Sequence, residues 1–118
     1  ELFESILNTD KPIMISSKEN PKHSKFYNHP QIQWLYCVPK YPCSIDDINF
    51  DEISNFDGFS NHCPETIAPI TAVNLGAQLI EIHITDDKSK DYFDNNVSFD
   101  YTELDEIMKV VRCAEGSK

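Results

Sequence analysis

The stretch Gln78-Leu79-Ile80-Glu81-Ile82-His83-Ile84-Thr85 decides the fold, because its aliphatic and polar side chains alternate. Alternation with a period of two predicts a β-strand with one apolar and one polar face. The polar face carries Glu81, His83 and Thr85, and the apolar face carries Ile80, Ile82 and Ile84. A strand with an apolar face toward helices and a polar face turned inward is typical of an α/β barrel near its mouth.

A second histidine lies at the end of a shorter strand-like run. His62 closes the run Asp57-Gly58-Phe59-Ser60-Asn61-His62. The carboxyl ends of neighbouring parallel strands meet at one edge of a sheet, so His62 and His83 could together hold one divalent metal. The pair is the main functional signal of the chain, and structural or solvated histidines are the competing interpretation.

Length and charge limit the function classes. The 118 residues form one domain at most, about half of a typical (β/α)8 barrel. The net charge of −10 and the isoelectric point near 4.6 argue against nucleic acid and against an anionic membrane surface as partners. No apolar run approaches the ~18 residues of a membrane span.

The ends and the cysteines predict a cytoplasmic piece of a longer protein. The chain starts at Glu1 without an initiator methionine, and no targeting signal is visible. We therefore expect residues 1–118 to be cut from a longer chain. Cys37, Cys43, Cys63 and Cys113 form no CxxC pair and no zinc-ligand spacing, which predicts reduced, packed thiols.

The remaining patterns predict alternating strands and helices, and therefore a parallel sheet. Strands are expected at 13–16, 31–38, 57–62 and 78–85. Helices are expected over 1–9, briefly at 46–55, over 64–75 with Pro64 in the first turn and Gly76 after its end, and after Asp100. Asp100 and Glu103 have the spacing of a capping box. Residues 86–96 are expected to be a charged loop.

Five motifs in this order resemble the sialic acid synthase family, also called N-acetylneuraminate synthases. The family carries KPVILSTG, LHCVSxYP, GYSDHT, GAxxIEKHFTLD and GPDxxxS. The corresponding stretches here are KPIMIS at 11–16, LYCVPKYP at 35–42, GFSNHC at 58–63, GAQLIEIHITDD at 76–87 and DNNVS at 94–98. The resemblance covers nearly the whole chain and corresponds to strands five to eight of the family's TIM-type (β/α) barrel, with short crossover helices.

The resemblance implies an enzyme that condenses phosphoenolpyruvate with an N-acyl amino sugar such as N-acetylmannosamine. By position, His62 and His83 would bind a divalent metal, Mn2+ or Mg2+, that polarises the sugar aldehyde. The other implied site residues are Glu81 in the active site, Ser16 and Ser60 on phosphoenolpyruvate, and Tyr41 and Asp94 on the sugar. Each of these residues could instead have a purely structural role. Glu81 could form an ion pair, the two serines could pack at strand ends, Tyr41 could pack under a loop, and Asp94 could be a solvated charge.

The chain also departs from the family pattern. Lys18 replaces the STG glycine, Asn61 the aspartate and Cys63 the threonine of GYSDHT, and Ile82 the lysine of EKH. The first four strands of the family's barrel are absent, with a glutamate on the metal and sugar side and the lysines that bind phosphate. We therefore expect residues 1–118 alone to be inactive.

Two other functions stay open at the level of sequence. A non-catalytic remnant could keep the fold as a sugar- or protein-binding domain, and Lys18, Asn61 and the short crossovers favour it. A different metal-dependent barrel enzyme, such as an aldolase or isomerase, would turn over without phosphoenolpyruvate. Pairing into a homodimer is possible under each of these.

Overall fold

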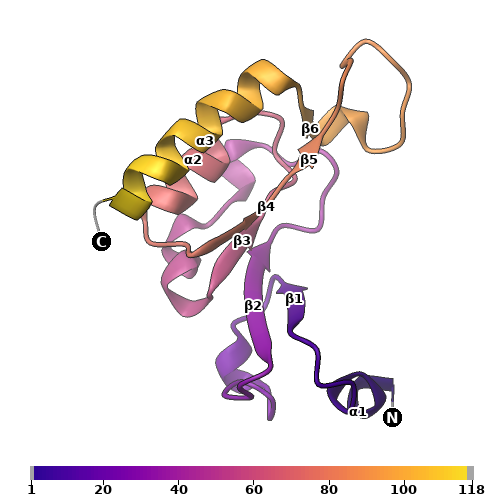
Figure 1. Ribbon diagram of the computed structural model, residues 1–118, viewed down its shortest axis with the longest axis vertical. Helices are drawn as coiled ribbons and strands as arrows, with labels where there is room; N and C mark the ends of the chain where they lie inside the picture. Colours follow the sequence, from indigo (N-terminus) through magenta and orange to yellow (C-terminus); the bar gives the residue numbers. More distant parts are fainter. Residues whose placement is uncertain (1, 117–118) are drawn as a thin grey trace.

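A four-stranded parallel sheet forms the centre of the computed structural model, which describes residues 2–116 (Figure 1). Its strands are β1 (Ile13–Ser17), β2 (Ile32–Cys37), β3 (Gly58–Ser60) and β4 (Leu79–Glu81), in that spatial order. The predicted α/β class with about four parallel strands is confirmed. Within residues 2–116 the sheet is open, with β1 and β4 at its edges, so closure into a barrel stays a prediction.

The first two crossovers are short 3-10 turns rather than α-helices. η1 (Pro21–His23) leads from β1 to β2, and η2 (Ile45–Asp47) and η3 (Phe50–Asn55) lead from β2 to β3. The prediction of a single helix over 46–55 is therefore wrong. Asn49 explains the break, because its side chain accepts a hydrogen bond from the Asp51 N–H and starts a second helical segment.

The third crossover contains the α-helix α2 (Ile67–Asn74), which begins later than expected. Pro64 lies before the helix and not in its first turn. Pro69 takes that place instead, where the missing N–H costs nothing because the first four N–H groups of a helix have no partner within it. Gly76 follows the helix with a φ of +104°, which confirms the predicted glycine stop.

The terminal helices agree with the sequence patterns. α1 (Leu2–Leu7) occupies the predicted N-terminal helix, whose residue 1 lies outside the described residues. α3 (Tyr101–Gly116) packs beside α2 on one side of the sheet (Figure 1). The capping box is confirmed, because the Glu103 N–H donates to Asp100 Oδ1 (2.9 Å) and the Asp100 N–H donates to Glu103 Oε1 (3.1 Å).

The alternating stretch from Gln78 to Thr85 forms two strands, not one. β4 pairs with β3, whereas β5 (His83–Ile84) pairs with β6 (Ser98–Phe99) in a separate two-stranded parallel sheet. The chain therefore changes its pairing partner at Ile82. β6 was not predicted, because two residues are too few to show a period. The 86–96 segment is the expected loop up to η4 (Asn95–Val97).

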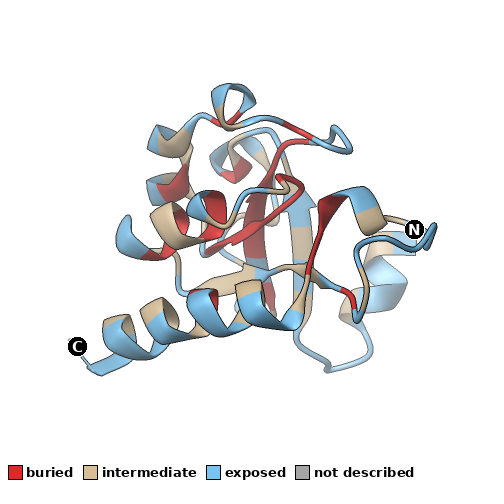
Figure 2. Cartoon of the chain, turned by 90° about the horizontal axis from the view of Figure 1, so that it is seen from above, coloured by how far each residue is buried: buried red, intermediate tan, exposed pale blue. Residues whose placement is uncertain are grey.

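The hydrophobic core joins residues of the sheet to residues of α2 and η3 on one side of it, and strands of this sheet are among the buried segments drawn red in Figure 2. Tyr36, Phe59 and Ile80 stand in register on three adjacent strands; Tyr36 and Phe59 belong to this core, and the partly buried Ile80 packs against it. Gly58 is required in β3, because a Cβ there would overlap the Leu79 carbonyl oxygen of the next strand. The close approach of β3 and β4 at Gly58 places Ser60 beside Glu81 further along the two strands.

Two further predictions concern the packing of the cysteine thiols and the absence of a membrane-spanning segment. Cys37, Cys43 and Cys63 are buried thiols, as expected, whereas Cys113 is exposed rather than packed. Among residues 2–116, no helix combines the length and apolarity needed to cross a membrane.

Candidate metal and substrate site

Three residues of adjacent strands form a row at the carboxyl end of the sheet. Cys37, Ser60 and Glu81 are in register on β2, β3 and β4. The buried hydroxyl of Ser60 donates to Glu81 Oε1 at 2.6 Å. Burial raises the pKa of the Cys37 thiol, and the nearby Glu81 carboxylate raises it further. Glu81 thus has a hydrogen-bonded neighbour in the sheet, which fits both an active-site carboxylate and a structural one.

His62 is buried and held by a main-chain carbonyl. Its Nδ1 lies 2.7 Å from the Val38 oxygen at the end of β2, and only 5% of the residue is exposed. Because a carbonyl oxygen can only accept, Nδ1 carries the proton. In the neutral ring this leaves the lone pair on Nε2, which is the form of histidine that binds a metal. A fixed second nitrogen is the usual arrangement of metal-binding histidines.

His83 stands at the start of β5 and faces an acidic residue. Its Nε2 lies 3.8 Å from Asp94 Oδ2, and both side chains are about one-third exposed (31% and 34%). Its Nδ1 is buried and has no hydrogen-bond partner among the described residues. Nε2 is therefore the nitrogen of His83 that is directed toward other functional groups.

The two histidine rings and one tyrosine ring are neighbours. The centroids of the His62 and His83 rings are 6.0 Å apart, and the Tyr41 ring lies 4.0 Å from the His62 ring. Desolvation raises the pKa of the Tyr41 hydroxyl, and the negative charges of Cys37, Asp94 and Glu81 raise it further. Residues from four separate motifs therefore share one electrostatic environment.

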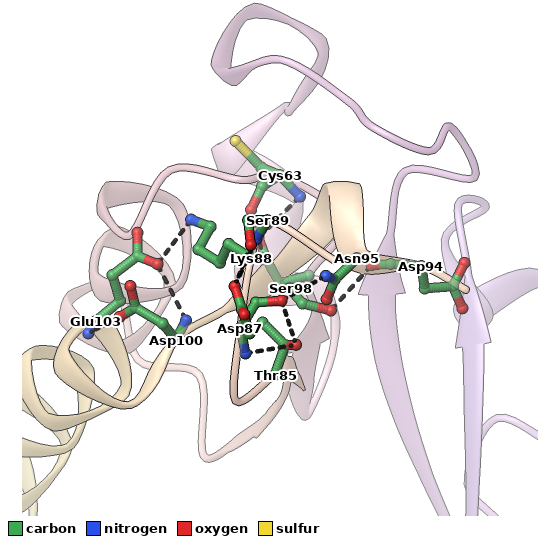
Figure 3. Close-up of polar contacts among 11 residues, drawn as sticks. Cys63, Thr85, Asp87, Lys88, Ser89, Asp94, Asn95, Ser98, Asp100 and Glu103 are labelled. Carbon is green, nitrogen blue, oxygen red and sulfur yellow. Dashed lines mark hydrogen bonds and ion pairs between the residues drawn. The ribbon is translucent and has the colours of Figure 1, made fainter. Parts of the chain in front are cut away.

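The loop after β5 holds Asp94 in place, as Figure 3 shows. Asp94 has a left-handed backbone (φ 62°), and its carbonyl accepts a hydrogen bond from the Ser98 hydroxyl at 2.9 Å. The amide of Asn95 donates to the carbonyls of Asp87 (2.9 Å) and Lys90 (2.7 Å). These bonds give the loop a defined shape even though it projects from the sheet.

The histidine pair fits a shared metal ion. A metal–nitrogen bond of about 2.1 Å places a metal about 3.2 Å from an imidazole centroid, so two ligands of one ion lie at most about 6.4 Å apart. The observed 6.0 Å is within this limit. Among residues 2–116, no three His, Cys, Asp or Glu side chains are grouped to hold a metal. The described residues therefore bring two candidate nitrogen donors, those of His62 and His83, within this distance.

Most of the predicted site residues are brought together. His62, His83, Tyr41 and Asp94 form one group, and Ser60 is bonded to Glu81 beside it. Ser16 lies apart on β1, exposed and in register with Leu35, one strand beyond the row that contains Ser60.

Two features of the surroundings of His62 were not predicted from the sequence. The Val38 carbonyl is one, and no side-chain pattern can reveal a main-chain acceptor. The amide of Asn61 is the other: it is fully buried, donates to the Cys63 carbonyl at 2.8 Å and accepts from the Cys63 N–H at 3.3 Å. The replacement of the family's aspartate by asparagine at this position was the sequence signal for it.

An open four-stranded parallel sheet with Cys37, Ser60 and Glu81 in register at its carboxyl edge defines an α/β domain. The fold matches the N-acetylneuraminic acid (sialic acid) synthetase of Leptospira borgpetersenii, solved in complex with citrate, with a TM-score of 0.83 at 23% identity. The alignment covers 96% of this chain and 45% of that one. At this identity the match shows the fold alone.

The chain belongs to the NeuB family, whose model matches residues 1–118. It is 34% identical over 96 residues to the pseudaminic acid synthase of Campylobacter jejuni, covering 75% of this chain and 28% of that protein. It is 33% identical over 95 residues to human N-acetylneuraminate-9-phosphate synthase, covering 74% of this chain and 26% of that protein. The matched region is thus about a quarter of the length of these relatives, which are named as synthases of sialic and pseudaminic acids.

Proposed function

We propose that this chain is the carboxyl-terminal half of the barrel of a sialic acid synthase-like enzyme, strands five to eight. The full-length enzyme condenses phosphoenolpyruvate with an N-acyl amino sugar, such as N-acetylmannosamine, in carbohydrate biosynthesis. One observation carries the proposal: His62 and His83 lie 6.0 Å apart in a chain that the NeuB model matches from end to end. We place the enzyme in the cytoplasm and expect it to act as a homodimer.

Two of the residues act on the aldehyde side of the reaction. His62 and His83 would hold Mn2+ or Mg2+, which when bound acts as a Lewis acid on the aldehyde of the sugar. The Val38 carbonyl keeps the proton of His62 on Nδ1, so that Nε2 remains a lone-pair donor. Asp94 lies beside His83 Nε2, where its carboxylate can orient a sugar hydroxyl as a hydrogen-bond acceptor.

The other residues would bind and orient the two substrates. Glu81 is the proposed active-site carboxylate, and the Ser60 hydroxyl fixes one of its oxygens. Ser60 and Ser16 are proposed contacts of phosphoenolpyruvate, although they lie on non-adjacent strands, β3 and β1. Tyr41 is half-exposed and its ring covers His62, so it can pack on the sugar and exclude water from the ring beneath it.

The proposal is tested by assaying 2-keto sugar acid formation by the full-length protein with phosphoenolpyruvate, N-acetylmannosamine and Mn2+. His62→Ala and His83→Ala should each lower kcat/KM by at least about 100-fold and weaken Mn2+ binding, because each removes a ligand. His23→Ala is the matched control, because His23 is an exposed histidine of η1. No product with several amino sugars, or unchanged activity of both site variants, would contradict the proposal.

The competing function is a non-catalytic member of the family that binds a sugar or a protein. The observation that favours it is Lys18, which is exposed where the family motif has glycine. Calorimetric sugar binding without turnover would support this alternative and reject the synthase. Turnover of a sugar without phosphoenolpyruvate would instead indicate an aldolase or isomerase.

A further inference from the structure

We propose that Asn61 is a positioning residue for His62, and that it acts through the hydrogen bond from its amide to the Cys63 carbonyl. The inference rests on the proposed function to the extent that His62 is taken as a metal ligand. It concerns a position where the chain has asparagine in place of the aspartate of the family motif.

Asn61 precedes His62 in the chain, and its side chain bonds to Cys63, which follows His62. Its side chain is completely buried, and both ends of its amide are used by the backbone of Cys63, two residues later. Its own N–H donates to the Glu81 carbonyl at 2.9 Å, which continues the pairing of β3 with β4. Asn61 therefore ties the turn that carries His62 to the strand that carries Glu81.

The histidine itself is held by two further hydrogen bonds, both to the segment 38–43 that follows β2. The His62 carbonyl accepts from the Cys43 N–H at 2.9 Å, and its Nδ1 donates to the Val38 carbonyl at 2.7 Å. The ring can keep its bond to Val38 only while the turn keeps its shape. The Asn61 amide is the side-chain contact that closes this turn, from Asn61 to Cys63.

The donor half of the amide is the part that an aspartate cannot replace. The amide nitrogen lies 2.8 Å from the Cys63 carbonyl oxygen. An ionised carboxylate in that place would put two acceptors in contact inside a region without exposure to water, which is unfavourable for both. In this chain the family's own residue would therefore disturb the turn rather than restore it.

The test compares Asn61→Asp with Asn55→Asp in the full-length protein. Asn55 is the matched control, since its amide also donates to an oxygen, Glu52 Oε2 at 3.3 Å, but at the end of η3 rather than beside His62. Titration with Mn2+, followed by electron paramagnetic resonance, should show at least about a tenfold loss of affinity for Asn61→Asp, as for other residues that orient metal ligands. Asn55→Asp should bind Mn2+ as the unaltered protein does.

A second measurement needs no metal. In metal-free protein, the 15N shifts of the His62 ring should report a proton on Nδ1, and Asn61→Asp should shift them toward a mixture of tautomers. Unchanged 15N shifts in the folded Asn61→Asp protein, or Mn2+ affinity within about twofold of the unaltered protein, would overturn the inference. If the unaltered protein binds no Mn2+, the proposed function fails, while the ring shifts still decide the role of Asn61.

Discussion

His62 shows how the backbone can set the chemistry of a side chain. One imidazole nitrogen is engaged by the Val38 carbonyl, and the ring lies beneath Tyr41. The same residue is 5% exposed, so little of it is available to bulk water. As the proposed metal ligand, His62 would therefore lose little conformational freedom on binding, because its ring is already buried and oriented.

The sequence predicted which side chains would meet, but not what holds them. The spacing of strand-end motifs was sufficient for the proximity of His62 and His83, because parallel strands end at one edge. The pairing of Asn61 with Cys63 and of His62 with Val38 depends on turn geometry, for which the sequence offers no period. The position of Ser16 relative to Ser60 likewise depends on register, which a single sequence does not determine.

The raised pKa of the Cys43 thiol leads us to expect that the folded chain loses stability at high pH. Burial, followed by the charges of Cys63 and Asp47, raises its pKa from 9.0 to about 11. The folded state therefore prefers the neutral thiol, so this contribution is complete below pH 9 and is lost as the pH rises through 11. We expect the free energy of unfolding to fall by about 2–3 kcal/mol over that interval.

Urea titrations between pH 8 and pH 11 provide the measurement. Cys43→Ala should be less stable at pH 8 because it leaves a cavity in the core, but its stability should depend less on pH. A variant with the same pH dependence as the unaltered chain would show that other groups cause the loss.

Among the elements, the strand over residues 78–85 is the instructive case. Its alternation was a correct signal for the side on which each residue lies, since Glu81 is in register with Ser60 and Ile80 joins the core. The same alternation did not reveal that the chain leaves one sheet at Ile82 and enters another. A period of two predicts which face of the sheet each side chain lies on, but it does not predict which strand pairs with this one.

α3 offers a direct test of an element that was predicted from its cap. Asp100→Ala removes the acceptor of the Glu103 N–H and should lower the free energy of unfolding by about 1 kcal/mol. Glu103 should keep its bond to Lys88, which joins the helix to the loop after β5 (Figure 3). The measurement is the urea midpoint of the variant.

Asp105→Ala is the control for this prediction, because it removes only an exposed i, i+4 ion pair with Lys109 and should change stability by less than about 0.5 kcal/mol. Equal effects of the two substitutions would show that the capping box does not stabilise α3.

On the scale of the whole molecule, β4 is an edge strand of the main sheet, and the chain continues from it into β5 of the second sheet. An apolar groove of about 620 Å³ extends between these strands and α3, and Ile82, Ile84 and Met108 line part of it. Ile84 faces this groove and is 53% exposed, which is why the predicted apolar face of the strand is only partly covered. Met14 on the opposite edge strand is also exposed (57%).

The isolated chain of residues 1–118 should therefore be inactive, although the full-length protein should make product. Among residues 2–116 no three side chains of metal-binding type are grouped, and the resemblance assigns the phosphate-binding lysines to strands outside this chain. Side-by-side assays of both proteins with phosphoenolpyruvate, N-acetylmannosamine and Mn2+ provide the check. Synthesis by the isolated chain would show that the half-site is sufficient.

The acceptor that fixes His62 belongs to a peptide group rather than to a side chain. Every amino acid at position 38, including proline, carries that oxygen, so no single codon change can delete it. A substitution at this position can alter packing while the carbonyl acceptor stays in place. The orientation of His62 therefore depends more on the residues that shape the turn around it than on the side chain at position 38.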